Sequence, residues 1–281
     1  MAFRIPADTG FPSAVPLVMG IVNVTPDSFS DGGRFLSPSA AVSHAIGMID
    51  EGADIIDVGP ESTRPDSEYV GADEQINRAI PVIESIREHD GEVAVSIDTR
   101  LAPVARAAIE AGANIVNDVS ALRDDPEMAG VIADAGATAV LMHMKGTPMD
   151  MQKHGGPQYD DVVNEVSSFL IERRKFAIAA GVDPSKIVLD PGIGFGKRVE
   201  HNLLILKHLD RFVSLGSPVL IGASRKSFIG KVLDVESPRK RDAGSLACAV
   251  LATLAGAAVL RVHDVRATVE AIRVCQAVAL M

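Results

Sequence analysis

The sequence has little of what marks a secreted or membrane protein. It contains only two cysteines, Cys248 and Cys275, whose spacing fits neither a metal site nor a CxxC motif. We interpret both as small apolar side chains in a protein of a reducing compartment. Residues 247–262, the longest apolar stretch, are interrupted by polar residues and are too few to span a bilayer. Residues 1–16 lack the apolar core of a signal peptide, so we expect a cytoplasmic protein without membrane contact.

Basic residues are fewer than acidic ones. The chain has 27 Lys and Arg against 37 Asp and Glu, a net charge of -10. Such a charge disfavours a general attraction to nucleic acid or anionic lipid, so we expect neither as a partner. Any anion that this protein binds must be held by a local cluster of Arg, Lys or helix N-termini.

Three chemical signatures are missing as well. No GxGxxG motif follows the first expected strand, which argues against a dinucleotide site. No GxSxG motif supplies a hydrolase nucleophile, and the glycine-rich residues 190–197 lack the form of a P-loop. The spacing of His143 and His154 does not match a zinc site.

What the chain does have is enough apolar material for a large core, with 47% hydrophobic residues in 281. A Gly-Ala phrase recurs at Gly52, Gly112, Gly136 and Gly256. Each copy follows an amphipathic stretch and precedes a short β-type run. Glycine readily takes the left-handed conformation just after a helix, so each copy predicts a helix, a glycine cap and a buried parallel strand.

Counting such runs predicts eight strands alternating with helices. The strands are expected at residues 17–24, 54–58, 93–98, 115–119, 139–143, 187–190, 219–222 and 259–263. The helices are expected at 39–50, 73–88, 103–111, 126–135, 159–180, 199–215, 243–255 and 265–279, with a shorter one at 227–232. This alternation predicts a single (β/α)8 TIM barrel domain over residues 1–281, with residues 1–16 as an N-terminal extension. An open doubly wound sheet is the alternative.

Barrel enzymes carry their sites at the C-terminal ends of the strands. Here all eight expected strands end in polar residues, which favours a ligand site over simple support of the loops. The polar ends are Asn23, Asp57, Glu61, Asp98, Asn117, Asp118, His143, Asp190, Ser224, Arg225, Lys226, Arg261 and His263.

These polar ends divide by charge. Arg225, Lys226, Arg261 and His263 follow the last two strands, where barrels often bind phosphate, and they predict an anion pocket. The alternative is that Arg225 and Lys226 are solvated or pair with nearby acids.

The acidic and amide group is Asp98, Asn117 and Asp190. It suits the edge of a ligand with several N–H donors, such as an aminopyrimidinone ring. The alternative, support of the strand ends, applies to Asp57 and Asp118 in particular. Long polar loops at residues 25–33 and 59–66 are of the kind that close over a site.

Nine segments of the sequence resemble the dihydropteroate synthase family. In order they are NVTPDSFSDGG (residues 23–33), ESTRP (61–65), SIDT (96–99), NDVS (117–120), LMHM (141–144), LDPGIGFGK (189–197), GASRKSFIG (222–230), GSLACAV (244–250) and RVHDV (261–265). They cover nearly the whole chain. The resemblance implies a TIM-barrel transferase of folate biosynthesis. It condenses (7,8-dihydropterin-6-yl)methyl diphosphate with 4-aminobenzoate to give 7,8-dihydropteroate and diphosphate. It further implies Mg²⁺ as cofactor, a homodimer, and sulfonamides as competitors of aminobenzoate.

The resemblance also implies a role for individual residues. Those of the pterin site are Asp98, Asn117, Met142, Asp190, Phe195 and Lys226. Those of the diphosphate site are Asn23, Arg261 and His263, with Asn23 also reaching the metal. Those around the aminobenzoate are Phe29, Thr63, Arg64, Pro65, Phe195 and Ser224. Asp98, Lys226, Arg261, His263 and Asp31 of the first loop are the implied catalytic residues.

The implied mechanism is dissociative: diphosphate departs, positive charge develops on the pterin methylene, and the arylamine attacks without a covalent enzyme intermediate. We retain three other readings. A methyltetrahydrofolate-dependent methyltransferase would share the pterin contacts but would not need the diphosphate residues. A non-catalytic pterin-binding paralogue would have no reason to keep both halves of the site. A sugar-phosphate barrel enzyme is the third.

Overall fold

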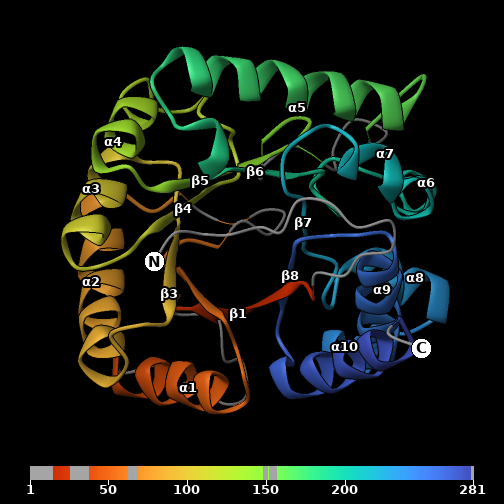
Figure 1. Cartoon of the computed structure of the whole chain (residues 1–281), viewed down its shortest axis with the longest axis horizontal. Helices are drawn as coiled ribbons and strands as arrows, with labels where there is room; N and C mark the ends of the chain where they lie inside the picture. The colour runs from red at the N-terminus through yellow and green to blue at the C-terminus, as the bar shows by residue number, and fades with distance from the viewer. Residues whose placement is uncertain are drawn as a thin grey trace.

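Eight parallel strands form one curled sheet with helices on its outside (Figure 1). The structure is a computed structural model that describes residues 15–25, 38–62, 67, 69–147, 151 and 157–279. The strands are β1 (Leu17–Asn23), β2 (Ile55–Gly59), β3 (Ala94–Asp98), β4 (Ile115–Asp118), β5 (Thr138–Met142), β6 (Ile187–Asp190), β7 (Leu220–Ile221) and β8 (Val259–Val262).

The strand order closes the sheet almost completely into a barrel. Neighbours run β6-β5-β4-β3-β2-β1-β8-β7, all parallel. The two edge strands meet through a parallel bridge between Leu189 and Val219, and the Leu189 N–H donates to the carbonyl of Pro218 at 2.8 Å. The expected (β/α)8 barrel is therefore confirmed, and the open doubly wound sheet is wrong.

Helices follow the strands around the outside of the barrel. They are α1 (Pro38–Asp50), α2 (Ala72–His89), α3 (Ala102–Glu110), α4 (Met128–Ala135), α5 (Val162–Ala179), α6 (Val199–Lys207), α7 (Leu209–Val213), α8 (Ser227–Leu233), α9 (Asp242–Leu254) and α10 (Val265–Ala279). Short 3-10 turns precede β6 (η1, Pro184–Lys186) and α9 (η2, Pro238–Arg241). No helix within these ranges combines the length and the apolar character needed to cross a lipid bilayer.

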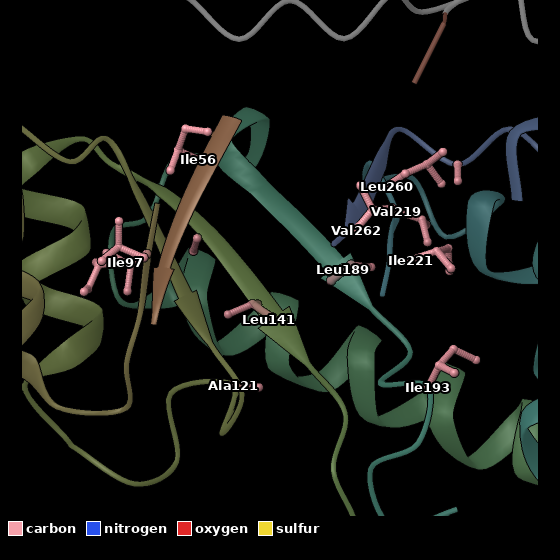
Figure 2. Close-up of a cluster of buried hydrophobic side chains, with 14 of the residues drawn as sticks. Ile56, Ile97, Ala121, Leu141, Leu189, Ile193, Val219, Ile221, Leu260 and Val262 are labelled. Atoms are coloured by element: carbon pink, nitrogen blue, oxygen red, sulfur yellow. The ribbon is translucent and has the colours of Figure 1, made fainter. Parts of the chain in front are cut away.

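The alternation of side chains along each strand divides the core in two. Outward residues pack against the helices, as Ile56, Leu141, Leu189 and Leu260 do in Figure 2. A separate cluster fills the barrel interior, and all eight strands contribute to it, β3 through the partly buried Ala94. These members are Met19, Ile55, Ala94, Ile115, Val140, Val188, Leu220 and Val259.

The same alternation puts polar residues above this apolar layer. Residues two and four positions further along a strand share its inward face. Two positions on stand the polar residues Asp57, Asn117, Asp190 and Arg261, together with the apolar Met142; four positions on stand Asn23, Asp98, Ser224 and His263. The interior is therefore apolar at the N-terminal end of the barrel and polar at its C-terminal mouth.

Helix ends follow the sequence pattern with one exception. Gly52, Gly112, Gly136 and Gly256 all have positive φ, as expected of the recurring phrase. The single helix expected at residues 199–215 is wrong, because His208 leaves helical geometry (φ −116°, ψ 34°) and separates α6 from α7. The break allows Leu209 and Phe212 of α7 to be buried.

Candidate functional site

An ion-pair cluster spans the mouth of the barrel. The guanidinium of Arg261, from β8, lies 2.6 Å from Oδ2 of Asp57 on β2. It also donates to Oδ2 of Asp98 on β3 at 2.9 Å. The amide of Asn117 on β4 donates to the same Oδ2 of Asp57 at 3.3 Å. One arginine thus holds two buried carboxylates, and Asp57 links it to the side-chain amide of Asn117.

Burial changes the protonation of this cluster. It raises the pKa of Asp98 to about 7, against the opposing charge of Arg261, while the negative charges of Asp57 and Asp118 raise that pKa further. Burial alone would lower the pKa of Arg261, but the charges of Asp57 and Asp98 raise it overall. Arg261 therefore keeps its charge, and Asp98 is the carboxyl that can take up a proton near neutral pH.

Asp190 ends β6 on the same inner face. Its Oδ1 accepts the N–H of Gly192 at 2.6 Å, and its register partner on β5 is Met142. Burial raises the pKa of Asp190, while that backbone hydrogen bond and the charge of Lys226 lower it. The carboxylate is thus held in one orientation by the loop that follows it.

An apolar and aromatic wall stands beside Asp190. Phe195 packs with Met142 in a small buried cluster, and Nζ of Lys226 lies 4.0 Å from the centre of the Phe195 ring. Gly194 makes room for the lysine, because a Cβ there would stand 3.0 Å from Cδ of Lys226. A cation over an aromatic ring beside a buried carboxylate suits a flat, nitrogen-rich heterocycle.

The part of the mouth formed by the ends of β7, β8 and β1 carries neutral and basic donors. Nδ1 of His263 lies 2.9 Å from Oγ of Ser224, and the His263 N–H donates to the same oxygen at 3.2 Å. Oδ1 of Asn23 faces Gly59, where a Cβ would lie only 3.3 Å away. Together with Arg261 these residues offer N–H donors and one amide oxygen at a single end of the barrel.

Asn23 supplies on this side an amide oxygen of the kind that hard cations such as Mg²⁺ bind. Among the described residues no group of three or more His, Cys, Asp or Glu is arranged to hold a metal ion alone. Mg²⁺ prefers oxygen ligands and is commonly held by one or two protein groups plus substrate phosphates. The donor set therefore fits a Mg²⁺ that arrives with a diphosphate.

Comparison with known proteins decides the family. Residues 19–263 match the family model described as "Pterin binding enzyme". Dihydropteroate synthase of Escherichia coli (strain K12) is 48% identical over 262 residues, which is 93% of this chain and 91% of that one.

Solved structures agree. Xanthomonas albilineans dihydropteroate synthase with 4-aminobenzoic acid is 48% identical, with a TM-score of 0.89 over 96% of this chain and 95% of that one. Yersinia pestis dihydropteroate synthase in a sulfonamide drug complex is 40% identical, with a TM-score of 0.91 over 100% of this chain and 99% of that one. The chain belongs to the dihydropteroate synthase family of pterin binding enzymes. It is accordingly a transferase of folate biosynthesis.

The predicted site residues that the structure describes lie at one mouth. Asn23, Asp98, Asn117, Met142, Asp190, Phe195, Ser224, Lys226, Arg261 and His263 all stand on the C-terminal ends of strands or on the loops that follow them. Five others lie outside the described residues: Phe29, Asp31, Thr63, Arg64 and Pro65.

Arg225 and Asp118, two of the polar residues at the strand ends, make contacts that support the fold. Arg225, which we expected in the anion pocket, instead donates to both oxygens of Asp242 at the start of α9, at 2.7 and 3.1 Å. Its pairing with a nearby acid was the alternative that the sequence left open. Asp118 accepts the N–H groups of Ser120 and Leu122, at 2.7 and 2.8 Å, and so supports the strand end as expected.

Sequence reasoning missed the role of Lys197. It named this residue only as the end of a glycine-rich loop, whereas its side chain is buried with Nζ 2.9 Å from Nδ1 of His143. The available signal was a lysine at the end of three alternating glycines, Gly192, Gly194 and Gly196, which bring backbone close to a neighbouring strand.

Proposed function

We propose that this chain joins (7,8-dihydropterin-6-yl)methyl diphosphate to 4-aminobenzoate, giving 7,8-dihydropteroate and diphosphate. The observation behind the proposal is that the proposed pterin half and the proposed diphosphate half of the site meet at the guanidinium of Arg261. Arg261 contacts Asp98, which we assign to the pterin, and stands on the strand that leads to His263, which we assign to the diphosphate.

The pterin half consists of acceptors and a stacking wall. We assign Asp98, Asn117 and Asp190 to the N–H edge of the ring, since buried carboxylates and an amide oxygen match several donors there. We assign Phe195 and Lys226 to its face, a role that their cation–π contact supports.

The diphosphate half consists of Arg261, His263 and Asn23. Their N–H groups neutralise negative charge as it develops on the departing diphosphate. Bound Mg²⁺, with Asn23 as one oxygen ligand, would supply further neutralisation of that charge. The acidic net charge of the whole chain makes this local cluster necessary for holding an anion.

The reaction we propose is a dissociative substitution. The bond between the methylene carbon and the diphosphate oxygen breaks, and its electron pair leaves with the diphosphate. The resulting positive charge spreads into the pterin ring, where Asp98 and Asp190 stabilise it. The neutral amine then forms the C–N bond and loses one proton to water. No nucleophilic side chain takes part, in keeping with the missing GxSxG motif.

The aminobenzoate half is assigned to Ser224 and Phe195, together with Thr63, Arg64, Pro65 and Phe29 of the two long loops. Asp31 is proposed as a further catalytic residue on the first loop. The complex of the Yersinia pestis relative with a sulfonamide drug supports sulfonamides as competitors at this half.

We also propose that a single domain of residues 1–281 works as a homodimer in the cytoplasm. The two free thiols, Cys248 and Cys275, support a reducing compartment. Exposed apolar side chains on three neighbouring helices support the dimer, since such patches mark protein interfaces. They are Val232 and Leu233 of α8, Leu251 and Leu254 of α9, and Val274 and Val278 of α10.

The deciding experiment is a turnover assay with the purified chain. Release of pyrophosphate should require pterin diphosphate, 4-aminobenzoate and Mg²⁺ together, and 7,8-dihydropteroate should form in equal amount. Arg261→Ala should lower kcat about a hundredfold or more, as does removal of one donor to a developing oxyanion. Arg239→Ala, on the exposed η2 turn, is the matched control and should keep wild-type turnover. Binding of pterin diphosphate without turnover would instead favour the non-catalytic paralogue.

A further inference from the structure

Lys197 ends the loop between β6 and α6 with its side chain inside the protein. The residue is 3% exposed. Its Nζ lies 2.9 Å from Nδ1 of His143 and donates to three carbonyls, of Gly192 at 2.9 Å, Phe195 at 3.0 Å and His143 at 3.3 Å. These four contacts join the end of β5 to two points of the following loop.

The Lys197 amine is surrounded by neutral hydrogen-bond acceptors. Burial of an ammonium is costly unless partners compensate it, and the four groups in contact are carbonyls and an imidazole. Burial lowers the pKa of His143 to about 2, so its ring is neutral and accepts a hydrogen bond. Burial also lowers the pKa of Lys197 to about 7, with the charge of Asp190 acting in the opposite direction. Burial of this amine costs free energy that burial of a Met or Leu would not cost. Lys197 therefore needs a function that those side chains could not perform.

Lys197 binds the backbone of residues that form the aromatic side of the proposed pterin site. Phe195, whose carbonyl it binds, carries the ring beneath Lys226. Gly192, whose carbonyl it also binds, donates its N–H to Asp190. The loop is pressed against the β5 end, because a Cβ on Gly192 would stand 1.9 Å from the carbonyl oxygen of His143. Lys197 is thus bonded to the backbone of the residue that carries the aromatic ring and of the residue that orients the carboxylate.

We propose that Lys197 is a positioning residue of the pterin site, which fixes Phe195 and Asp190 by drawing the β6–α6 loop onto His143. This proposal rests on the proposed function. It makes a selective claim, because none of the groups that Lys197 contacts belongs to the proposed diphosphate residues Asn23, Arg261 and His263. Loss of the ammonium should therefore weaken pterin binding and leave anion binding unchanged.

The test is Lys197→Met, which keeps an unbranched side chain one heavy atom shorter and removes its donors. Calorimetry would measure the Kd of 6-hydroxymethyl-7,8-dihydropterin and, separately, the Kd of inorganic pyrophosphate with Mg²⁺. The pterin Kd should rise about tenfold or more, since small displacements of binding groups have effects of this size. The pyrophosphate Kd should stay within about twofold of wild type.

Two further variants separate positioning from general support of the fold. Lys186→Met removes another lysine that donates to a backbone carbonyl, that of Gly136, at the opposite end of β6, and it should leave both affinities unchanged. Lys197→Gln keeps one amide donor on a shorter chain, so its pterin Kd should lie between wild type and Lys197→Met. It also supplies the comparison if the Met variant does not fold.

Unchanged pterin affinity in both Lys197 variants, or an equal loss of pterin and pyrophosphate affinity, would overturn the proposal. If the wild-type chain itself binds no pterin, the proposed function fails instead.

Discussion

Arg261 is the residue on which the two halves of the site depend. It is paired with Asp57 and Asp98, and Asp57 is fully buried. One guanidinium between two carboxylates leaves this trio with a net negative charge when both are ionised. Protonation of one carboxyl removes that excess, and the raised pKa of Asp98 marks it as the group that takes the proton. The charge of the trio is therefore sensitive to pH near neutrality.

This protonation predicts a pH dependence of stability. Because the folded-state pKa of Asp98 is about 7 and its ordinary value is 3.8, the folded chain binds the proton more tightly than the unfolded chain between these values. Its contribution to the free energy of unfolding is therefore full below about pH 4 and is lost as pH rises to about 7. Each unit of pKa difference is worth about 1.4 kcal/mol. In urea denaturation, wild type should lose stability relative to Asp98→Asn across this range.

Asp90 provides a control, because its pKa is shifted in the opposite direction and its effect on stability should depend on pH with the opposite sign. Hydrogen bonds from the N–H groups of Glu92 and Val93 lower the pKa of this exposed carboxyl. Wild type should therefore lose stability relative to Asp90→Asn only as pH falls below about 4. Parallel pH curves for wild type and Asp98→Asn would show that Asp98 is ionised throughout the range.

At the scale of elements, the backbone of the loop of residues 190–197 packs closely against its neighbours beside the site. Gly192 has φ +68°, and Gly196 has φ +57° with a Cβ position 2.2 Å from the carbonyl oxygen of Lys145. Any side chain at either position must displace backbone of the neighbouring loop. The glycines of this motif are therefore required by packing, apart from any contact with a ligand.

Gly192→Ala should destabilise the fold by about 3 kcal/mol or more, from left-handed strain plus overpacking against His143. Differential scanning calorimetry would measure the loss. The matched control is Gly47→Ala within α1, where a Cβ meets no atom within 4 Å. That substitution should raise stability by about 0.5–1 kcal/mol, because alanine loses less entropy in a helix. A neutral Gly192→Ala variant would mean that the loop can move away from β5 without cost.

The element boundaries show where sequence reasoning succeeds. All eight strands lie within two residues of their expected bounds, because apolar runs between a glycine cap and a polar end leave little freedom. The helix break at His208 was not predictable, since residues 199–215 continue a helical pattern through it. Burial of Leu209 and Phe212 against the rest of the barrel decides that break.

At the scale of the whole molecule, one outer face is unusually apolar. Helices α8, α9 and α10 lie together on one side of the barrel (Figure 1) and carry the exposed leucines and valines assigned to the dimer. Polar residues surround the mouth, so this face is separate in character from the site. A two-fold dimer buries the same patch on both subunits, so an apolar face of this kind suits such a dimer.

Replacing Leu251 and Leu254 by Glu should convert the proposed dimer to a monomer, because burying two added carboxylates at an interface is strongly unfavourable. Sedimentation velocity would measure the change in mass. Ile171→Glu, on the exposed face of α5 away from the apolar face, is the matched control and should remain dimeric. A wild-type chain that sediments as a monomer would remove the proposed dimer.

By itself the sequence determined the strand count, the parallel barrel and the end of it that carries polar residues. Side-chain alternation is a local property, so Ile55 at the floor of the barrel already implies that Asp57 faces the same interior. Only the tertiary structure decided which charges pair. Arg261 meets Asp57 across 204 positions, whereas Arg225 turns to Asp242 and Lys197 is buried against His143. These pairings depend on distances that exist only once the barrel closes, and short-range sequence patterns contain no information about them.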